Sequence, residues 1–287
     1  MLGYLLIVVF TLLNLFESVA VRTYAKRHGS GGMLMNAIVA LFAALFFLVT
    51  DTGGFYAPKE MIPLAMINAC LFGAGFYFTF ISYRIGPYGL TRLISSFSLL
   101  FSIFYGILFL NETPGITTYI GIAAIVIAMV LINYQKKGGD EEKGISLKWL
   151  ICITISTVAN GFIAILTRMQ QIRFDNACSN EFQFISIGGS FLLLAVLGII
   201  IDRDKLPYII KHGTLYGLAA GIFNGAKNFL TLVIYTLLPL SILSPMKTGL
   251  NMIATFILAL WFYKEKYTKL QWIGVFLGVA AVILLAF

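Results

Sequence analysis

The chain has 287 residues, of which 60% are hydrophobic and only 11% charged, whereas an average soluble domain is about 45–50% apolar and about 25% charged. A water-soluble fold of this size could not bury so much apolar surface, so the composition predicts an integral membrane protein. The net charge of +8 comes from basic residues that cluster in short connections between apolar segments. Such clusters are typical of loops beside anionic lipid, so we expect a lipid bilayer and no nucleic acid as partner.

Apolar segments follow one another along the whole chain. A helix needs about 20 residues to cross the hydrocarbon core, and each segment approaches or exceeds that length. The segments are continuous rather than alternating, which disfavours membrane strands. The first has no basic residue before it, so we expect a spanning helix and not a removable signal peptide. The sequence thus predicts an all-α membrane protein with ten transmembrane helices, at 2–22, 33–50, 61–83, 88–110, 115–134, 149–169, 182–201, 213–236, 239–262 and 269–287.

A hydrophilic linker at 135–147 divides the chain into two halves, 1–134 and 148–287. Shifting the sequence by 153 positions places Glu112 on Glu265 and Gly121 on Gly274. We therefore predict an internal repeat of five helices. An odd number of helices makes the second repeat enter the membrane from the opposite side. Inverted repeats around a shared central cavity are an architecture of secondary transporters.

The two repeats carry similar motifs. The Glu112 and Glu265 turns continue into Tyr119-Ile-Gly121 and Trp272-Ile-Gly274, and the stretch GPYGLTRLISSF from Gly86 opens the fourth segment. On these residues the chain resembles the drug/metabolite transporter superfamily, specifically its EamA-type members. The resemblance covers nearly the whole chain. It implies ten helices as two inverted five-helix repeats, and the transport of a small molecule.

The connections on the two sides of the membrane differ in charge. Most of the 20 Lys and Arg residues lie in the connections after the odd-numbered segments. The positive-inside rule then predicts that both termini lie outside the cytoplasm. Ten-helix relatives are usually drawn with both termini inside. The short loops and the composition suggest a bacterial plasma membrane.

The eighth segment carries the most informative polar residues. Ionisable groups inside a spanning helix cost about 2.5–3.5 kcal/mol each, so they normally face a cavity or a partner. A helical spacing of three, four and seven residues puts four polar side chains on one face, and we predict that they bind substrate: Asn224, Lys227, Asn228 and Thr231. The neighbouring glycines 217, 221 and 225 predict close helix packing.

The ninth segment contains a proline near its start. Pro245 lacks a backbone N–H and crowds the carbonyl of Ser241, so the helix is predicted to kink or break there. Interrupted helices are where transporters build binding sites. We therefore expect substrate contacts from the side chains that follow, Lys247, Thr248 and Asn251.

Further candidates lie on other segments. Asn14, Asn160, Tyr77 and Arg92 are predicted to contact substrate, although Arg92 could equally anchor the helix at the membrane interface. Glu17 is expected either to pair with a buried cation or to serve in coupling. An acidic residue in the first helix resembles the small multidrug-resistance relatives, where such a Glu exchanges protons for cations. Here its repeat mate is Ile163, which weakens that parallel.

The chain lacks the usual signs of catalysis. His28 and His212 are expected at loop positions, and the three cysteines share no metal-ligand spacing. We find no HExxH, P-loop or Ser-His-Asp pattern. The sequence therefore predicts no enzyme activity, no cofactor and no metal.

The charges inside the helices suggest the kind of substrate. Arg92, Lys227 and Lys247 outnumber Glu17, so an anion should complete the site. We expect a secondary transporter of a small anionic or zwitterionic metabolite, such as an amino acid, organic acid or phosphorylated compound, with a proton or ion as a possible coupling partner. The alternatives are a proton-coupled exporter of cationic or drug-like compounds using Glu17, an intramembrane lipid-handling protein or enzyme, and a purely structural membrane protein.

Overall fold

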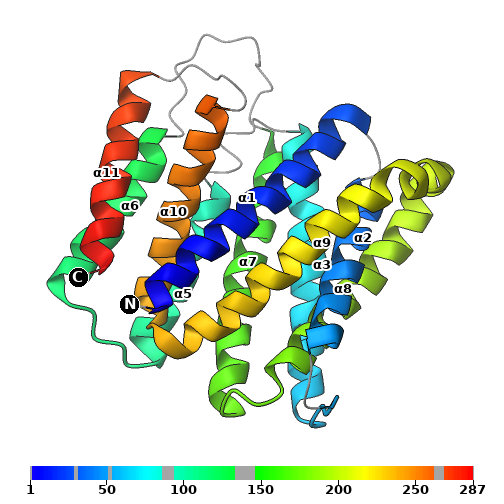
Figure 1. Cartoon of the computed structure of the whole chain (residues 1–287), viewed down its shortest axis with the longest axis horizontal. Helices are drawn as coiled ribbons and strands as arrows, with labels where there is room; N and C mark the ends of the chain where they lie inside the picture. The colour runs from blue at the N-terminus through cyan, green and yellow to red at the C-terminus, as the bar shows by residue number, and fades with distance from the viewer. Residues whose placement is uncertain are drawn as a thin grey trace. The chain divides into compact units, whose positions relative to one another are not determined.

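The computed structural model describes residues 2–28, 32–50, 54–85, 94–132, 146–261 and 268–286 (Figure 1). Within these ranges every regular element is a helix, as the composition predicted. The helices are α1 (Leu2–His28), α2 (Gly32–Thr50), α3 (Met61–Ile85), α5 (Ser98–Phe109), α6 (Ile116–Ile132), α7 (Leu147–Arg173), α8 (Ser179–Asp202), the 3₁₀ turn η1 (Arg203–Lys205), α9 (Leu206–Leu237), α10 (Leu240–Trp261) and α11 (Lys269–Ala286).

The helices follow the predicted apolar segments, but several extend beyond them. The first segment was predicted to end at residue 22, whereas α1 continues to His28, and α9 begins at Leu206 rather than at 213. Apolar windows mark only the part of a helix that lipid or core requires, and a helix continues into polar residues at its ends. Only the part of the predicted fourth helix from residue 94 onward lies in the described ranges.

Among the described residues, five helical stretches are long and apolar enough to cross a membrane by length and composition. They are Leu2–Val21, Gly32–Thr50, Met61–Thr79, Leu147–Arg173 and Ser179–Leu237. Shorter apolar helices cover residues 94–109, 116–131 and 269–285. This pattern is that of a multi-pass membrane protein.

The chain forms two compact units, and each draws residues from both halves of the sequence. Unit 1 comprises Met1–Leu15, Ile81–Gly161 and Ile234–Phe287, and unit 2 comprises Phe16–Phe80 and Phe162–Val233. Helices α1, α3, α7 and α9 contribute residues to both units. Long helices therefore connect the two units, rather than a single linker.

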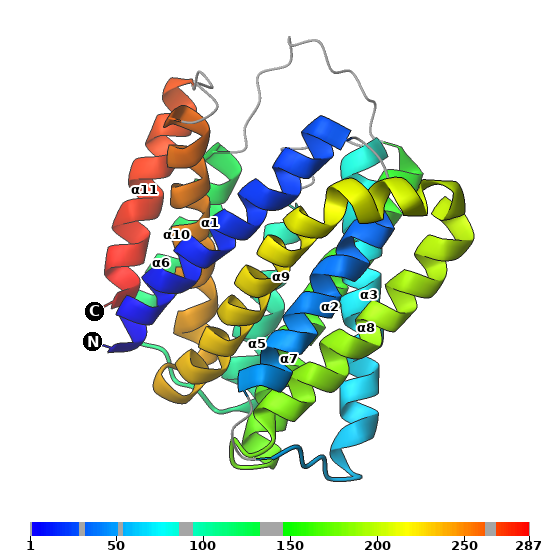
Figure 2. The same cartoon turned by 45° about the vertical axis from the view of Figure 1, so that its right-hand side comes forward.

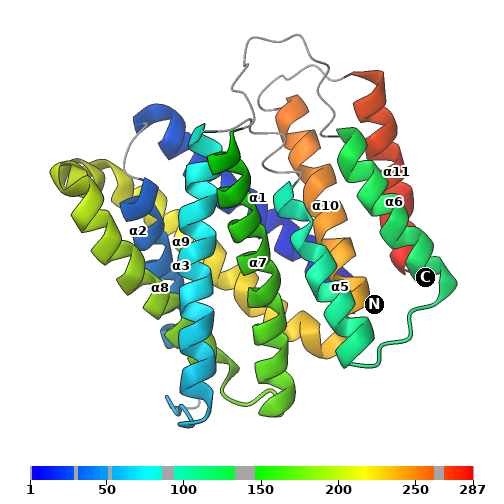
Figure 3. The ribbon, with the colours of Figure 1, turned by 180° about the vertical axis from the view of Figure 1, so that it is seen from behind.

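Unit 1 is held together by close packing of α6, α10 and α11. Helices α6 and α11 lie side by side (Figures 1 and 3), and they are the last helices of the two predicted repeats. A Cβ built on Gly121 of α6 would lie 2.7 Å from the Leu285 side chain. On α10, a Cβ at Gly249 would lie 2.5 Å from Ile125 and 2.7 Å from Val282. Glycines thus allow these helices to approach closely.

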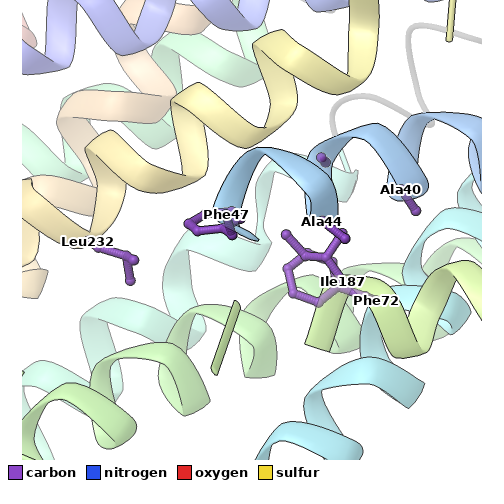
Figure 4. Packing of buried hydrophobic residues seen from close by; sticks show 7 residues of the cluster. Ala40, Ala44, Phe47, Phe72, Ile187 and Leu232 are labelled. Atoms are coloured by element: carbon purple, nitrogen blue, oxygen red, sulfur yellow. The ribbon is translucent and has the colours of Figure 1, made fainter. Parts of the chain in front are cut away.

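Unit 2 packs α2 against α8, with α3 and α9 completing the core (Figure 2). One face of α2 carries the buried small residues Ala40, Ala43 and Ala44. Because these side chains are small, larger side chains of the neighbouring helices can pack against α2. Figure 4 shows this core, in which Phe72, Ile187 and Leu232 come from α3, α8 and α9.

The glycine stripe of α9 packs closely, as predicted. Gly217, Gly221 and Gly225 face Ile38, Phe42 and Phe46 of α2. A Cβ at Gly221 would lie 2.5 Å from the Phe42 Cβ and 2.8 Å from the Val39 carbonyl oxygen. The second of these atoms belongs to the backbone, which cannot rotate away.

We expect Gly221→Val to destabilise the protein by about 1–3 kcal/mol, because the added methyl groups force α2 and α9 apart. The measurement is thermal unfolding of the purified protein in detergent. Ile222→Val is the matched control, since that side chain is 45% exposed on the same helix. Equal melting temperatures for the two variants would contradict the packing argument.

Candidate functional site

Glu17 and Lys227 form an ion pair in unit 2. Glu17 lies on α1 and Lys227 on α9, and their side chains are only 13% and 16% exposed. The pairing expected for Glu17 is therefore confirmed, and Lys227 is its partner. Removing one partner of such a pair would leave the charge of the other partner buried without compensation.

The polar face of α9 extends this ion pair. The Asn224 amide donates to Glu17 Oε1 at 2.8 Å, and the Asn228 amide donates to Asn224 Oδ1 at 2.9 Å. Thr231 donates to the carbonyl of Lys227 at 2.9 Å. The structure thus brings Asn224, Lys227 and Asn228 together with Glu17 in one network, whereas the bond of Thr231 stays within its own helix.

A second polar group lies in unit 1, where α10 meets the first half of α1. The Lys247 ammonium lies 4.0 Å from the centre of the Phe10 ring. One turn along each helix, the Asn14 amide donates to Asn251 Oδ1 at 3.2 Å. Phe10 was not among the predicted site residues. Its spacing of four residues from Asn14 is the signal that could have found it.

The helix is not interrupted at Pro245. Helix α10 runs from Leu240 through Pro245 to Trp261, so of the predicted kink or break the break is wrong, and the kink stays a prediction. The proline lies in the second turn, where it removes a single backbone hydrogen bond, and the remaining turns keep theirs. Lys247 and Thr248 are therefore presented on regular helix, where both are half-buried.

Among the described residues, no hydrogen bond joins Asn160 or Tyr77 to the network of Glu17 and Lys227 or to the group around Lys247. Asn160 of α7 donates to the Ser156 carbonyl at 2.9 Å, within its own helix. The Tyr77 ring lies 5.1 Å from that of Phe78. Arg92 lies outside the described residues.

Arg168 is a half-buried cation that was not among the predicted site residues. It lies within α7, which extends to Arg173 rather than ending at residue 169. Its Nε atom is buried and has no hydrogen-bond partner among the described residues. A buried guanidinium N–H normally has an acceptor, so Arg168 joins the candidate site.

Both histidines lie in helices, and the prediction of loop positions is wrong. His28 is the last residue of α1 and His212 lies inside α9, because both helices continue beyond their apolar parts. The two rings stack with centroids 5.3 Å apart, and His28 Nδ1 lies 2.9 Å from the Tyr208 hydroxyl.

Burial, with a smaller effect of Tyr208, raises the pKa of Tyr24 above its usual value.

Acidic, histidine and cysteine side chains do not gather into a metal site. Among the described residues no three His, Cys, Asp or Glu side chains lie close enough to hold an ion. The predicted absence of a metal stays a prediction.

Comparisons with known proteins agree with this architecture. The model of the EamA-like transporter family matches residues 1–134 and 147–287. A solved structure, described as a crystal structure of a protein, matches with a TM-score of 0.78 and 13% sequence identity, over 99% of this chain and 98% of its own. That identity supports a shared fold alone. No curated protein sequence matches.

Proposed function

We propose that this chain, which belongs to the EamA-like transporter family and so to the drug/metabolite transporter superfamily, is a secondary transporter of a small anionic or zwitterionic metabolite. Its family and its apolar helices make it a multi-pass membrane transporter. The proposal places it in a bacterial plasma membrane, with two inverted repeats that open alternately to the two sides. Inverted repeats of other transporters work in this way.

The observation that carries the substrate class is the excess of positive charge inside the helices. Lys227, Lys247 and Arg168 lie in the interiors of α9, α10 and α7, and Glu17 pairs with Lys227. The buried Arg168 Nε has no acceptor among the described residues. Carboxylates and phosphates are the groups that guanidinium and ammonium donors bind best.

In this proposal the two polar groups have different roles. Lys247, Thr248, Asn251 and Asn14 in unit 1 contact the anionic part of the substrate. The ion pair of Glu17 and Lys227 serves the coupling step, because protonation of the carboxylate would release the ammonium. A bound cation beside Lys227 would be repelled by it, which disfavours the alternative of a cation exporter.

The test is a ligand screen by thermal shift on the purified protein, followed by uptake into proteoliposomes. We expect carboxylates or phosphates to stabilise the protein and to be transported unchanged. Covalent change of the solute would indicate an enzyme instead. Transport of quaternary amines, abolished by Glu17→Gln and insensitive to Lys247→Met, would favour the cation exporter.

Lys247→Met should weaken binding of the anionic solute at least about tenfold, because a charge-assisted hydrogen bond contributes about 1.5–3 kcal/mol. Affinity is measured by titration of the thermal shift. Lys269→Met, at the exposed start of α11, is the control and should bind as the unchanged protein does. Equal affinities for both variants would remove Lys247 from the site.

A further inference from the structure

The hydrogen bonds from Asn228 to Asn224 and from Asn224 to Glu17 form a chain with a fixed direction. The Asn228 amide donates to Asn224 Oδ1 at 2.9 Å, and the Asn224 amide donates to Glu17 Oε1 at 2.8 Å. An ionised carboxylate can only accept hydrogen bonds. Asn224 must therefore turn its Nδ2 toward Glu17 and its Oδ1 toward Asn228, and Asn228 must use its own Nδ2 to reach Asn224.

The outward end of this chain is the Oδ1 atom of Asn228. In the part of the chain that the structure describes, no hydrogen bond reaches this oxygen. Asn228 is half-buried, whereas its neighbours on the same face of α9, Asn224 and Thr231, are only 5% and 8% exposed. This face therefore points into the protein, and its accessible end presents an acceptor oxygen.

Protonation of Glu17 would reverse the direction of the chain. The ion pair with Lys227 is then lost, but the carbonyl oxygen of the neutral carboxyl still accepts from the ammonium, because a charged donor makes the stronger hydrogen bond. The O–H is left for Asn224, which must offer it Oδ1 and turn its Nδ2 toward Asn228. Asn228 turns in the same way, so an N–H donor replaces the oxygen at its outward end.

The charged surroundings of Glu17 direct this change into α9. Among the described residues, the charged side chain that pairs with Glu17 is Lys227 of α9. Helix α2, which packs against the following turns of α1, carries no charged residue. The cation of α10, Lys247, lies over the ring of Phe10, seven residues before Glu17. The Asn224 and Asn228 amides are thus the groups that respond to the charge of Glu17.

We propose that Asn224 and Asn228 couple a proton on Glu17 to the anionic substrate, so that the protein binds proton and anion together. This inference rests on the proposed function, in which the substrate is anionic or zwitterionic. With Glu17 ionised, Asn228 presents an oxygen, which repels an anionic oxygen. With Glu17 protonated, Asn228 presents an N–H, which donates to it. Asn228 is then a substrate contact, and Asn224 is a positioning residue that acts through it.

The experiment measures proton uptake when sulfate or pyruvate is added to the purified full-length protein in weakly buffered detergent solution. Both anions stay ionised in the working range, so the change in pH reports on the protein. The anion must favour the proton by the same factor as the proton favours the anion. We expect saturable uptake that approaches about one proton per chain, and binding at least about tenfold tighter in acid than in alkaline solution.

The outcomes separate this inference from the proposed function. Saturable binding of either anion without proton uptake would overturn the coupling through the amides and leave the proposed transport function intact. Binding of neither anion at any pH would contradict both. Because the unchanged protein is used, neither result depends on whether a variant folds.

Glu17→Gln tests the reversed direction, because Gln offers one acceptor to Lys227 and an N–H to Asn224, as a neutral Glu does. This variant should bind the anion as the unchanged protein does in acid, and should take up no proton.

Asn224→Leu interrupts the chain of hydrogen bonds while Glu17 and Lys227 remain. The preference for acid should fall well below that of the unchanged protein. Asn68→Leu is the matched control and should keep the proton uptake, since that amide is 0% exposed in the same unit and bonds to Ser186 instead. An undiminished preference for acid in Asn224→Leu would assign the effect to the charge of Glu17 alone and overturn the proposal.

Discussion

Replacing Glu17 by Gln is expected to destabilise the protein by on the order of 3 kcal/mol, because removing one partner of a buried ion pair leaves the other charge uncompensated. Lys227 would remain on α9 without its carboxylate, and a Gln side chain keeps only one acceptor oxygen for both Asn224 and Lys227. Lys227→Met should be destabilising for the same reason. Thermal unfolding in detergent measures both effects.

The double variant Glu17→Gln/Lys227→Met should be closer to the unchanged protein than either single variant, since no unpaired charge remains. Glu60→Gln is the control for loss of a carboxylate, because Glu60 is exposed. Simple addition of the two single effects would show that the pair is not coupled. Uptake measurements on the double variant then test the coupling role without an unpaired charge.

Glu112→Ala is expected to cost about 2–4 kcal/mol, because the side chain holds the beginning of α10. The Glu112 carboxylate accepts hydrogen bonds from the backbone N–H groups of Leu240 and Ser241, each at 2.8 Å. These N–H groups have no partner inside the helix, and a carboxylate there also faces the positive end of the helix dipole. Hydrogen bonds to a charged group are among the stronger ones.

Glu112→Gln should show about half of this effect, because a Gln has one acceptor oxygen for two N–H groups. Hydrogen exchange at Leu240 and Ser241 should accelerate in both variants, which locates the loss at this helix terminus. Thr113→Ala, at the exposed neighbouring position, should leave exchange unchanged. Unaltered exchange in Glu112→Ala would contradict the capping role.

Composition and the long apolar runs determined the helical class and the approximate helix positions, and the motifs after Glu112 and Glu265 pointed to the family by resemblance. Long apolar runs can satisfy their backbone groups in lipid only as helices or closed barrels, and continuous runs exclude alternating strands. The glycine stripe of α9 was also predictable, because a spacing of four residues places small side chains on one face. The α9 residues Asn224, Lys227 and Asn228 were found for the same reason.

Partners from distant parts of the chain were beyond sequence reasoning. The spacing along α9 could not show that Lys227 meets Glu17, since residues 17 and 227 are 210 positions apart in the sequence. Glu112 was noticed only as a repeat marker, and its bonds to Leu240 and Ser241 depend on where α10 begins. Glu265, its repeat mate, lies outside the described residues.

Helix ends and the direction of hydrogen bonds show the same limit. Apolar windows ended the first segment too early, which placed His28 in a connection rather than in a helix. The direction of the bonds from Asn228 to Asn224 follows only from the contact of Asn224 with Glu17 on α1. The sequence by itself thus determined which segments are helices and which faces are polar, because both follow from local periodicity. Only the tertiary structure decided which polar groups meet, because that depends on contacts between helices far apart in the chain.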